Sequence, residues 1–282
     1  YQLLIFQLSI PMLLFPNCKI NLGLHILNKR EDGFHNLETV FYPIALKDAL
    51  EIIPSPGSSI TFTGSGLIVD GKEDDNICLK AYHLLKRDFP QLPFIKMHLH
   101  KAIPMGAGLG GGSADGAFTL QLLNTKFNLA LSVQQLIDYA LQLGSDCPFF
   151  IINKPCYATG RGELLEGIDI SLAGYKIVII NPGIHVNTGW AFSQITPAEP
   201  HKKLKEIIAQ SVTTWKAELI NDFEAPVFEK YPEIKNIKEA LYNKGAVYAA
   251  MSGSGSSVYG IFETEIDLSS FADKNYFVKI IS

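Results

Sequence analysis

Five glycines fall among the seven residues from Gly106 to Gly112, and this segment is the strongest candidate for chemistry in the chain. Glycine lets the backbone take positive φ angles and approach a ligand without a Cβ atom in the way. Apolar residues at helical spacing, from Ala114 to Leu122, predict a helix after the glycines. A glycine loop that opens into a helix presents unpaired N–H groups and the positive end of the helix dipole. Because both features attract an anion, usually a triphosphate, the segment predicts a phosphate-binding loop.

Three familiar patterns do not account for this loop. Gly106-x-Gly108-x-x-Gly111 matches the dinucleotide fingerprint, but the carboxylate expected about 20 residues later is missing. No lysine follows the glycines as a P-loop requires, and the chain lacks the His-Arg-Asp and Asp-Phe-Gly stretches of protein kinases. A flexible linker would be rich in Ser and Gly on both sides, whereas Pro104-Met105 precedes these glycines. The pattern indicates a phosphate loop of another kind.

Polar residues that could act beside such a loop lie on predicted elements elsewhere. A strand predicted from Met12 to Leu27 carries Lys19 and Asn21 on the face opposite its apolar residues. A lone lysine on a strand is usually a solvated edge residue. Asp146 follows a helix predicted from a capping box at Ser132 to Gly144, and a carboxylate there could be a turn or cap residue. These alternatives stay open on spacing alone. In the C-terminal part of the chain, helices are predicted over roughly residues 201–210, 213–231 and 233–244.

A resemblance to a known family adds to this interpretation. Pro104-Met-Gly-Ala-Gly-Leu-Gly-Gly-Gly-Ser113 resembles the ATP-binding loop of the GHMP small-molecule kinases, which include galactokinase, homoserine kinase and mevalonate kinase. Within them the chain is most similar to the diphosphocytidyl-methylerythritol kinases of the non-mevalonate isoprenoid route. The other matching stretches are Lys19-Ile-Asn21-Leu-Gly-Leu, Asp32-Gly-Phe-His35, Gly144-Ser-Asp146-Cys-Pro148 and Ser252-Gly-Ser-Gly-Ser-Ser257. These motifs occur in the family's order.

The resemblance implies an α+β fold of two domains with the active site between them. An N-terminal ATP-binding α/β domain is expected over residues 12–165, and a C-terminal α+β substrate-side domain over residues 166–282. Residues 1–11 are expected to be an extension outside the fold, although an extra edge strand or partner-binding segment is the alternative.

The family's functional residues map onto matching positions here. Asp146 would accept the proton of the attacking hydroxyl, and Lys19 would stabilise the developing charge. Ser113 would lie near a phosphate-bound Mg²⁺. The implied ATP-binding residues are Pro104, Met105, Gly106, Ala107, Gly108, Leu109, Gly110, Gly111, Gly112, Ser113 and Ala114, with Asn76 near the adenine. The implied residues for the diphosphocytidyl alcohol substrate are Asn21, Phe34, His35, Thr188 and Phe192.

Composition excludes several other classes of function. The net charge is −4, so no general attraction to nucleic acid or to an anionic membrane is expected. Four scattered cysteines without a Cys-x-x-Cys pair predict reduced thiols and a cytoplasmic protein. His98 and His100 could share a metal, but no third ligand is in view and a solvated face is the preferred interpretation. The sequence does not indicate an oligomeric state.

Three functions remain at this point. The residues alone predict an ATP-dependent kinase of a small alcohol, and the resemblance favours the diphosphocytidyl substrate. Another GHMP kinase, such as homoserine or mevalonate kinase, is the first alternative. A non-catalytic nucleotide-binding regulator is the second, and the retained Lys19 and Asp146 argue against it.

Overall fold

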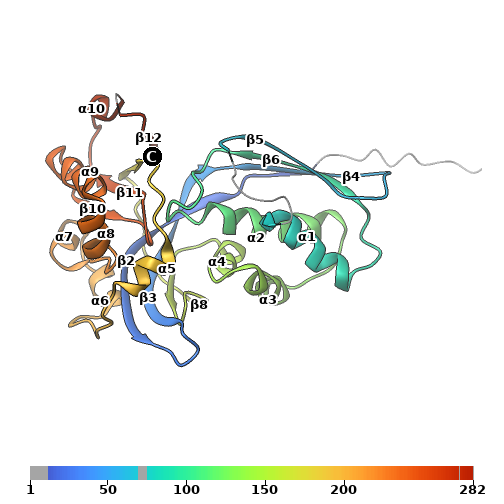
Figure 1. The fold of residues 1–282 in the computed structure, drawn as a ribbon, viewed down its shortest axis with the longest axis horizontal. Helices are drawn as coiled ribbons and strands as arrows, with labels where there is room; N and C mark the ends of the chain where they lie inside the picture. The colour runs from blue at the N-terminus through green and yellow to red at the C-terminus, as the bar shows by residue number, and fades with distance from the viewer. Residues whose placement is uncertain (1–11, 69–74, 273, 282) are drawn as a thin grey trace, which may run out of the picture. The chain divides into compact units, whose positions relative to one another are not determined.

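Three four-stranded sheets and the helices around them form the framework of the protein, shown in Figure 1. This computed structural model describes residues 12–68, 75–272 and 274–281, so the expected extension over residues 1–11 lies outside the described residues. The chain divides into two compact units. Unit 1 comprises residues up to Pro16, Lys47–Ala102 and Gly112–Ile151; unit 2 comprises Asn17–Leu46, Ile103–Gly111 and Ile152–Ser282. Each unit is built from several separate segments of the chain, so the units do not meet at a single boundary. The predicted domain boundary near residue 165 therefore stays a prediction.

Unit 1 is one sheet with its helices gathered on one side, as Figure 1 shows. The strand order is β1 (Met12–Leu14), β4 (Ala49–Pro54), β6 (Ile95–Lys101) and β5 (Thr61–Gly66), and only the β5–β6 pair is parallel. Alternate residues of β6, such as Met97 and Leu99, are buried, which confirms the predicted alternation of this strand. The helices are α1 (Ile77–Asp88), α2 (Gly111–Lys126), α3 (Val133–Leu143) and α4 (Cys147–Ile152).

The local signals for two of these helices are confirmed. The Ser132 side chain accepts a hydrogen bond from Gln135 N, and the Gln135 side chain accepts one from Ser132 N, so the predicted capping box is present. Asn76 caps α1 by accepting from Cys78 N at 2.9 Å. The predicted apolar stripe of α3 is narrower than expected, since Val133 is 62% exposed.

Unit 2 contains two antiparallel sheets and the remaining helices. One sheet has the order β2 (Asn17–Lys29), β3 (His35–Lys47), β7 (Cys156–Thr159) and β8 (Leu164–Gly167). The other has the order β10 (Tyr248–Met251), β11 (Val258–Phe262), β9 (Lys176–Asn181) and β12 (Phe277–Ile281). The helices of unit 2 are α5 (Thr188–Ser193), α6 (Leu204–Ile208), α7 (Trp215–Glu218), α8 (Glu224–Lys230), α9 (Pro232–Asn243) and α10 (Ser269–Ala272).

The second sheet of unit 2 has an apolar core on each face. Ile177 and Ile179 of β9 belong to the core that includes Ile20 and Trp215, and Val178 belongs to the core that includes α9. Burial on both faces explains the continuous apolar run of this strand. The mixture of helices and largely antiparallel sheets confirms the α+β class.

One predicted helix is wrong in its extent. The sequence predicted a helix over residues 213–231, but a short 3₁₀ turn and α7 end at Glu218, and α8 begins only at Glu224. Between them Asn221 forms a parallel bridge with Leu24 of β2. Tertiary pairing with β2 therefore overrides the helical pattern here. Over the described residues, no helix is long and apolar enough to cross a membrane.

Candidate active site

The glycine loop has the backbone that its composition predicts. Gly106, Gly108 and Gly110 have φ angles of 60°, 76° and 69°, a region that residues with a Cβ atom rarely adopt. A Cβ atom on Gly108 would lie 1.9 Å from the carbonyl oxygen of Ser252. The loop leads directly into α2, as predicted. These glycines are required both by the φ angles and by the close approach of a second loop.

That second loop is the Ser252–Ser257 stretch between β10 and β11. The Ser252 hydroxyl donates to Gly108 O at 2.8 Å, and Ser257 N donates to Ala107 O at 3.1 Å. The glycine loop as far as Gly111 and the whole Ser252–Ser257 loop belong to unit 2. The C-terminal glycine motif thus donates hydrogen bonds to two backbone carbonyls of the predicted phosphate loop.

Lys19 lies against the same loop and is only 3% exposed, so the solvated-edge alternative is wrong. Its Nζ donates to Asn21 Oδ1 at 2.5 Å and to Gly108 O at 3.2 Å. Its backbone N–H also donates to Leu109 O at 2.9 Å. Strand β2 therefore places an ammonium group against the backbone of the glycine loop.

Strand β2 has a more uniform burial than its alternation predicted, because every residue from Asn17 to Ile26 is buried. Asn21 is held by its side-chain N–H group, which donates to Thr39 Oγ1 at 2.9 Å, and by its backbone N–H, which donates to Ser252 Oγ at 3.2 Å. Gly23 has a φ of 68°, which interrupts the regular alternation. Asn21 is thus fixed between β3 and the Ser252 loop.

In unit 1, Ser113 and Asp146 lie beside the same thiol. Burial raises the pKa of Cys147 to about 12, the Ser113 hydroxyl lowers that pKa by a hydrogen bond, and the Asp146 charge raises it. Asp146 immediately precedes α4. A hydroxyl and a carboxylate are oxygen donors of the kind that Mg²⁺ prefers, and Mg²⁺ usually keeps several waters and phosphate oxygens. The predicted place of Ser113 near a phosphate-bound Mg²⁺ stays a prediction, and the described residues hold no cluster of three His, Cys, Asp or Glu ligands.

The predicted substrate residues of unit 2 fall into small groups. The rings of His35 and Phe192 stack with centroids 5.1 Å apart and an interplanar angle of 15°. Burial and the charge of Lys29 lower the pKa of His35. Phe34 is 53% exposed at the β2–β3 turn, under the Arg161 guanidinium. Thr188 shares a hydrogen bond of 3.0 Å with Ser254 of the second glycine loop.

Two predicted assignments stay open. Lys19 belongs to unit 2 and Asp146 to unit 1, so their predicted convergence on one hydroxyl stays a prediction. The Asn76 side-chain oxygen caps α1, and its contact with adenine stays a prediction as well.

A buried charge cluster in unit 1 was missed by sequence reasoning. Lys101 Nζ lies 2.5 Å from Asp48 Oδ2 and 2.7 Å from Asp115 Oδ2, and all three side chains are almost fully buried. Burial, the largest cause, raises the pKa of Asp115 to about 8. In the sequence, each of these three residues is a charged residue beside an apolar stretch. That pattern is too common in proteins to indicate a buried cluster.

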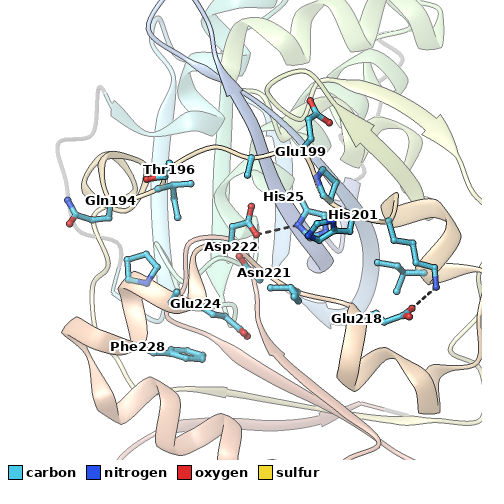
Figure 2. A pocket seen from close by; sticks show the side chains of 18 of the residues that line it. His25, Gln194, Thr196, Glu199, His201, Glu218, Asn221, Asp222, Glu224 and Phe228 are labelled. Carbon is cyan, nitrogen blue, oxygen red and sulfur yellow. Dashed lines mark hydrogen bonds and ion pairs between the residues drawn. The ribbon is translucent and has the colours of Figure 1, made fainter.

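A cavity of about 920 Å³ lies elsewhere in unit 2, and none of the predicted site residues lines it (Figure 2). Its wall includes His25, whose Nδ1 lies 3.3 Å from Asp222 Oδ1. The segment Ile220–Glu224, which sequence reasoning also missed, contributes Ile220, Asn221, Asp222 and Glu224 to the wall of this cavity.

Comparisons with known proteins agree with these motifs. The family model for the GHMP kinase N-terminal domain matches residues 76–154, and the model for the GHMP kinase C-terminal domain matches residues 202–277. A 4-diphosphocytidyl-2-C-methyl-D-erythritol kinase of Bacteroides fragilis is 56% identical over 90% of this chain and 93% of the relative. A kinase with the same name from Cytophaga hutchinsonii is 52% identical over 90% of this chain and 93% of the relative.

Solved structures show the same relationship. A crystal structure of 4-(cytidine 5'-diphospho)-2C-methyl-D-erythritol kinase matches with a TM-score of 0.76 and 30% identity, covering 89% of this chain and 90% of the other. A mevalonate kinase structure matches with a TM-score of 0.70 at 13% identity, which shows the shared fold alone. The chain belongs to the GHMP kinase family, and within it to the 4-diphosphocytidyl-2-C-methyl-D-erythritol kinases.

Proposed function

We propose that this protein transfers the γ-phosphoryl group of ATP to the 2-hydroxyl of 4-diphosphocytidyl-2-C-methyl-D-erythritol, in non-mevalonate isoprenoid precursor biosynthesis. The observation that carries the proposal is the buried Lys19 ammonium, held by Asn21 Oδ1 and Gly108 O within the glycine loop. A buried ammonium at the backbone of an anion-binding loop is suited to phosphate chemistry. Relatives more than 50% identical carry the name of this activity.

The loop is proposed to bind the phosphates through its backbone N–H groups. Phosphoryl transfer needs positioning and charge neutralisation more than covalent chemistry, so a rigid glycine loop is suited to the reaction. A Mg²⁺ ion bound with ATP would neutralise phosphate charge, and Ser113 is the residue whose hydroxyl would lie beside it. The positive φ angles at Gly106, Gly108 and Gly110 support a loop shaped for close contact.

Asp146 is proposed to take the proton of the acceptor hydroxyl. The O–H bond breaks as the oxygen forms its bond to the γ-phosphorus, and the proton moves to the carboxylate. The bond between the γ-phosphorus and the oxygen that bridges it to the β-phosphate breaks, so ADP leaves with that electron pair. Lys19 would stabilise the negative charge that builds on the transferred group. The assignment is supported by the position of Asp146 beside Ser113 and Cys147 at the start of α4.

The stacked pair of His35 and Phe192 is proposed to bind the cytosine ring. Aromatic rings prefer offset stacking, and Phe192 already rests edge-on against Phe223 at 4.9 Å. The lowered pKa of His35 favours a neutral imidazole, which can both donate and accept hydrogen bonds with a base. Thr188, at the Ser254 hydroxyl, is proposed to contact the diphosphate.

The test is an ADP-release assay with four acceptors: the diphosphocytidyl alcohol, homoserine, mevalonate and galactose. Turnover is expected with the diphosphocytidyl alcohol alone, in the presence of Mg²⁺. Turnover with another acceptor would support a different GHMP kinase. ATP binding without turnover of any of the four would support the regulator alternative.

A cytoplasmic location is part of the proposal. All four cysteines are buried and none forms a disulfide: Cys18, Cys78, Cys147 and Cys156. Free thiols are typical of a reducing compartment.

A further inference from the structure

The segment Ile220–Glu224 is hydrogen-bonded along strand β2. Leu24 N donates to Ile220 O at 2.9 Å, and Asp222 N donates to Leu24 O at 2.9 Å. The Asp222 carboxylate also accepts from Ile26 N at 2.8 Å. The segment is therefore fixed to the strand that carries Lys19 and Asn21.

The same segment holds the start of the second glycine loop through Asn221, which is 1% exposed. Asn221 Nδ2 donates to Met251 O and to Gly253 O, both at 2.8 Å, and its Oδ1 accepts from Phe223 N at 3.0 Å. Glu224 Oε1 accepts from Met251 N at 2.8 Å. The Asn221 amide thus binds the carbonyl on each side of Ser252.

Ser252, whose neighbours Met251 and Gly253 are held by Asn221, in turn contacts the glycine loop and the surroundings of Lys19. Its hydroxyl donates to Gly108 O at 2.8 Å and accepts from Asn21 N at 3.2 Å. Lys19 Nζ donates to the same Gly108 O at 3.2 Å. One carbonyl oxygen is therefore shared by the Ser252 hydroxyl and the Lys19 ammonium, so a shift of Ser252 changes the surroundings of Lys19.

The other side of the segment is less constrained. Asn221, Asp222 and Glu224 contribute to the wall of the cavity of about 920 Å³ shown in Figure 2. Packed side chains do not fill that side as they would in a closed core. The hydrogen bonds of the Asn221 amide, together with the one that Glu224 accepts from Met251 N, then contribute most to the distance between the segment and the Ser252 loop. Of these residues, only Asn221 bonds beyond Ser252, at Gly253 O.

We propose that Asn221 is a positioning residue for phosphoryl transfer. By fixing the carbonyls of Met251 and Gly253, it holds the Ser252 hydroxyl at Gly108 and so holds Lys19 at the phosphate loop. The inference rests on the proposed function, because it assigns Asn221 to the reaction in which Lys19 takes part. Asn221 touches neither substrate nor reacting atoms in this role.

The first test is the kinetics of Asn221→Ala and Asn221→Asp with ATP and the diphosphocytidyl alcohol. A displacement of about 1 Å at a reacting group can cost ~10²-fold in rate, so kcat is expected to fall by roughly 10- to 100-fold. The KM values for both substrates are expected to change much less than kcat. A wild-type kcat in both variants would overturn the inference.

The Asn221→Asp variant provides a pH readout that a general loss of stability would not produce. An ionised carboxylate at this position faces two carbonyl oxygens and is buried, so its pKa should be raised. Once protonated, the carboxyl can donate one of the two lost hydrogen bonds. The ratio of variant to wild-type kcat is therefore expected to rise as the pH is lowered from 8 to 6. A ratio that stays flat over this range would contradict the positioning role.

Tyr242→Phe is the matched control. Its hydroxyl donates to Ala249 O at 3.1 Å, on the same strand β10 but before the loop. This variant is expected to lose thermal stability while keeping the wild-type kcat. A kcat loss in Tyr242→Phe equal to that of the Asn221 variants would show that any weakening of β10 suffices, and would overturn the inference.

Ser252→Ala keeps the test decisive if the Asn221 variants do not fold. Loss of its hydroxyl is expected to lower kcat as well. Where Asn221→Asp does fold, its combination with Ser252→Ala should lose less than the product of the two single effects. A Ser252→Ala variant with wild-type kcat would overturn the inference on its own. A wild-type enzyme that phosphorylates none of the acceptors would instead overturn the proposed function.

Discussion

At the scale of single residues, the site depends on groups whose charge is buried and already bonded. Lys19 is 3% exposed and donates to a side-chain oxygen and to a carbonyl oxygen. Desolvation makes such a group costly unless its hydrogen bonds are kept, which ties its position to the loop around it. The position of Lys19 beside the glycine loop could be predicted from its motif, whereas local alternation alone favoured a solvated lysine. The catalytic role of Asp146 stays a prediction. The Lys101–Asp48–Asp115 cluster could not be predicted, because its members come from separate segments and no short-range pattern links them.

The role of Asp146 gives the first prediction. Asp146→Asn removes the proton acceptor and keeps the shape, so kcat is expected to fall ~10²-fold or more, since general bases typically contribute 10²–10⁴. Binding of ATP, measured by calorimetry, should stay near that of the wild type. Asp138→Asn, on the exposed side of α3, is the control and should keep full turnover. Near-normal kcat in Asp146→Asn would rule out the base role.

The cysteines give a second prediction at this scale. Cys18 and Cys147 are sequence neighbours of the predicted site residues Lys19 and Asp146, but both thiols are buried, and burial raises the pKa of Cys147 to about 12. Because the thiolate is the reactive form, iodoacetamide at pH 7.5 is expected to label the native protein very slowly. The unfolded protein in urea should be labelled quickly at all four positions. Rapid native labelling at Cys147, located by mass spectrometry, would contradict this burial.

At the scale of elements, the glycine loop and the capped helices were predictable because short-range rules decide them. The capping box of α3 and the Asn76 cap of α1 need only neighbouring residues. The predicted helix over residues 213–231 failed because Asn221 pairs with Leu24, about 200 residues away in the chain, as the parallel bridge shows. Such a partner is invisible in a local window.

The glycine loop gives the prediction that belongs to this scale. Gly108→Ala places a Cβ atom 1.9 Å from Ser252 O and also requires alanine at a φ of 76°. We expect ATP binding to weaken by at least ~10-fold and the variant to unfold more easily, since the left-handed conformation alone costs roughly 1–2 kcal/mol. Calorimetry measures the loss of ATP affinity, and thermal unfolding measures the loss of stability.

Gly174→Ala separates the two causes. Gly174 has a φ of 88° but no atom within 4 Å of an added Cβ, so this variant carries the conformational cost without the clash. It should be mildly destabilised and bind ATP normally. Equal behaviour of the two variants would show that the contact between the two glycine loops is unimportant.

At the scale of the whole molecule, the free energy of unfolding should depend on the buried cluster of unit 1. Burial raises the pKa of Asp115 to about 8 in the folded protein, from the ordinary value of 3.8 for an aspartate. Between these values the folded state binds a proton that the unfolded state has released. This contribution to stability is complete below about pH 4 and is lost as the pH rises through about 8.

Urea unfolding from pH 5 to pH 8.5 measures this effect. The free energy of unfolding should decline with rising pH, with a slope from this group of at most about 1.4 kcal/mol per pH unit. Asp115→Asn removes the titrating group and should flatten the curve, while the exposed control Asp138→Asn should follow the wild type. Parallel curves for wild type and Asp115→Asn would contradict the raised pKa.

The interleaving of the two units has a consequence for synthesis on the ribosome. Strands β2 and β3 are made early, but β7 and the Ile220–Glu224 segment that bond to them are made much later. All segments of unit 1 have been translated by Ile151, whereas unit 2 must wait for residues that follow. Nascent chains therefore carry an unpaired strand edge through much of translation, a state prone to misassociation. A chaperone that shields strand edges should raise the yield of active enzyme during cell-free translation.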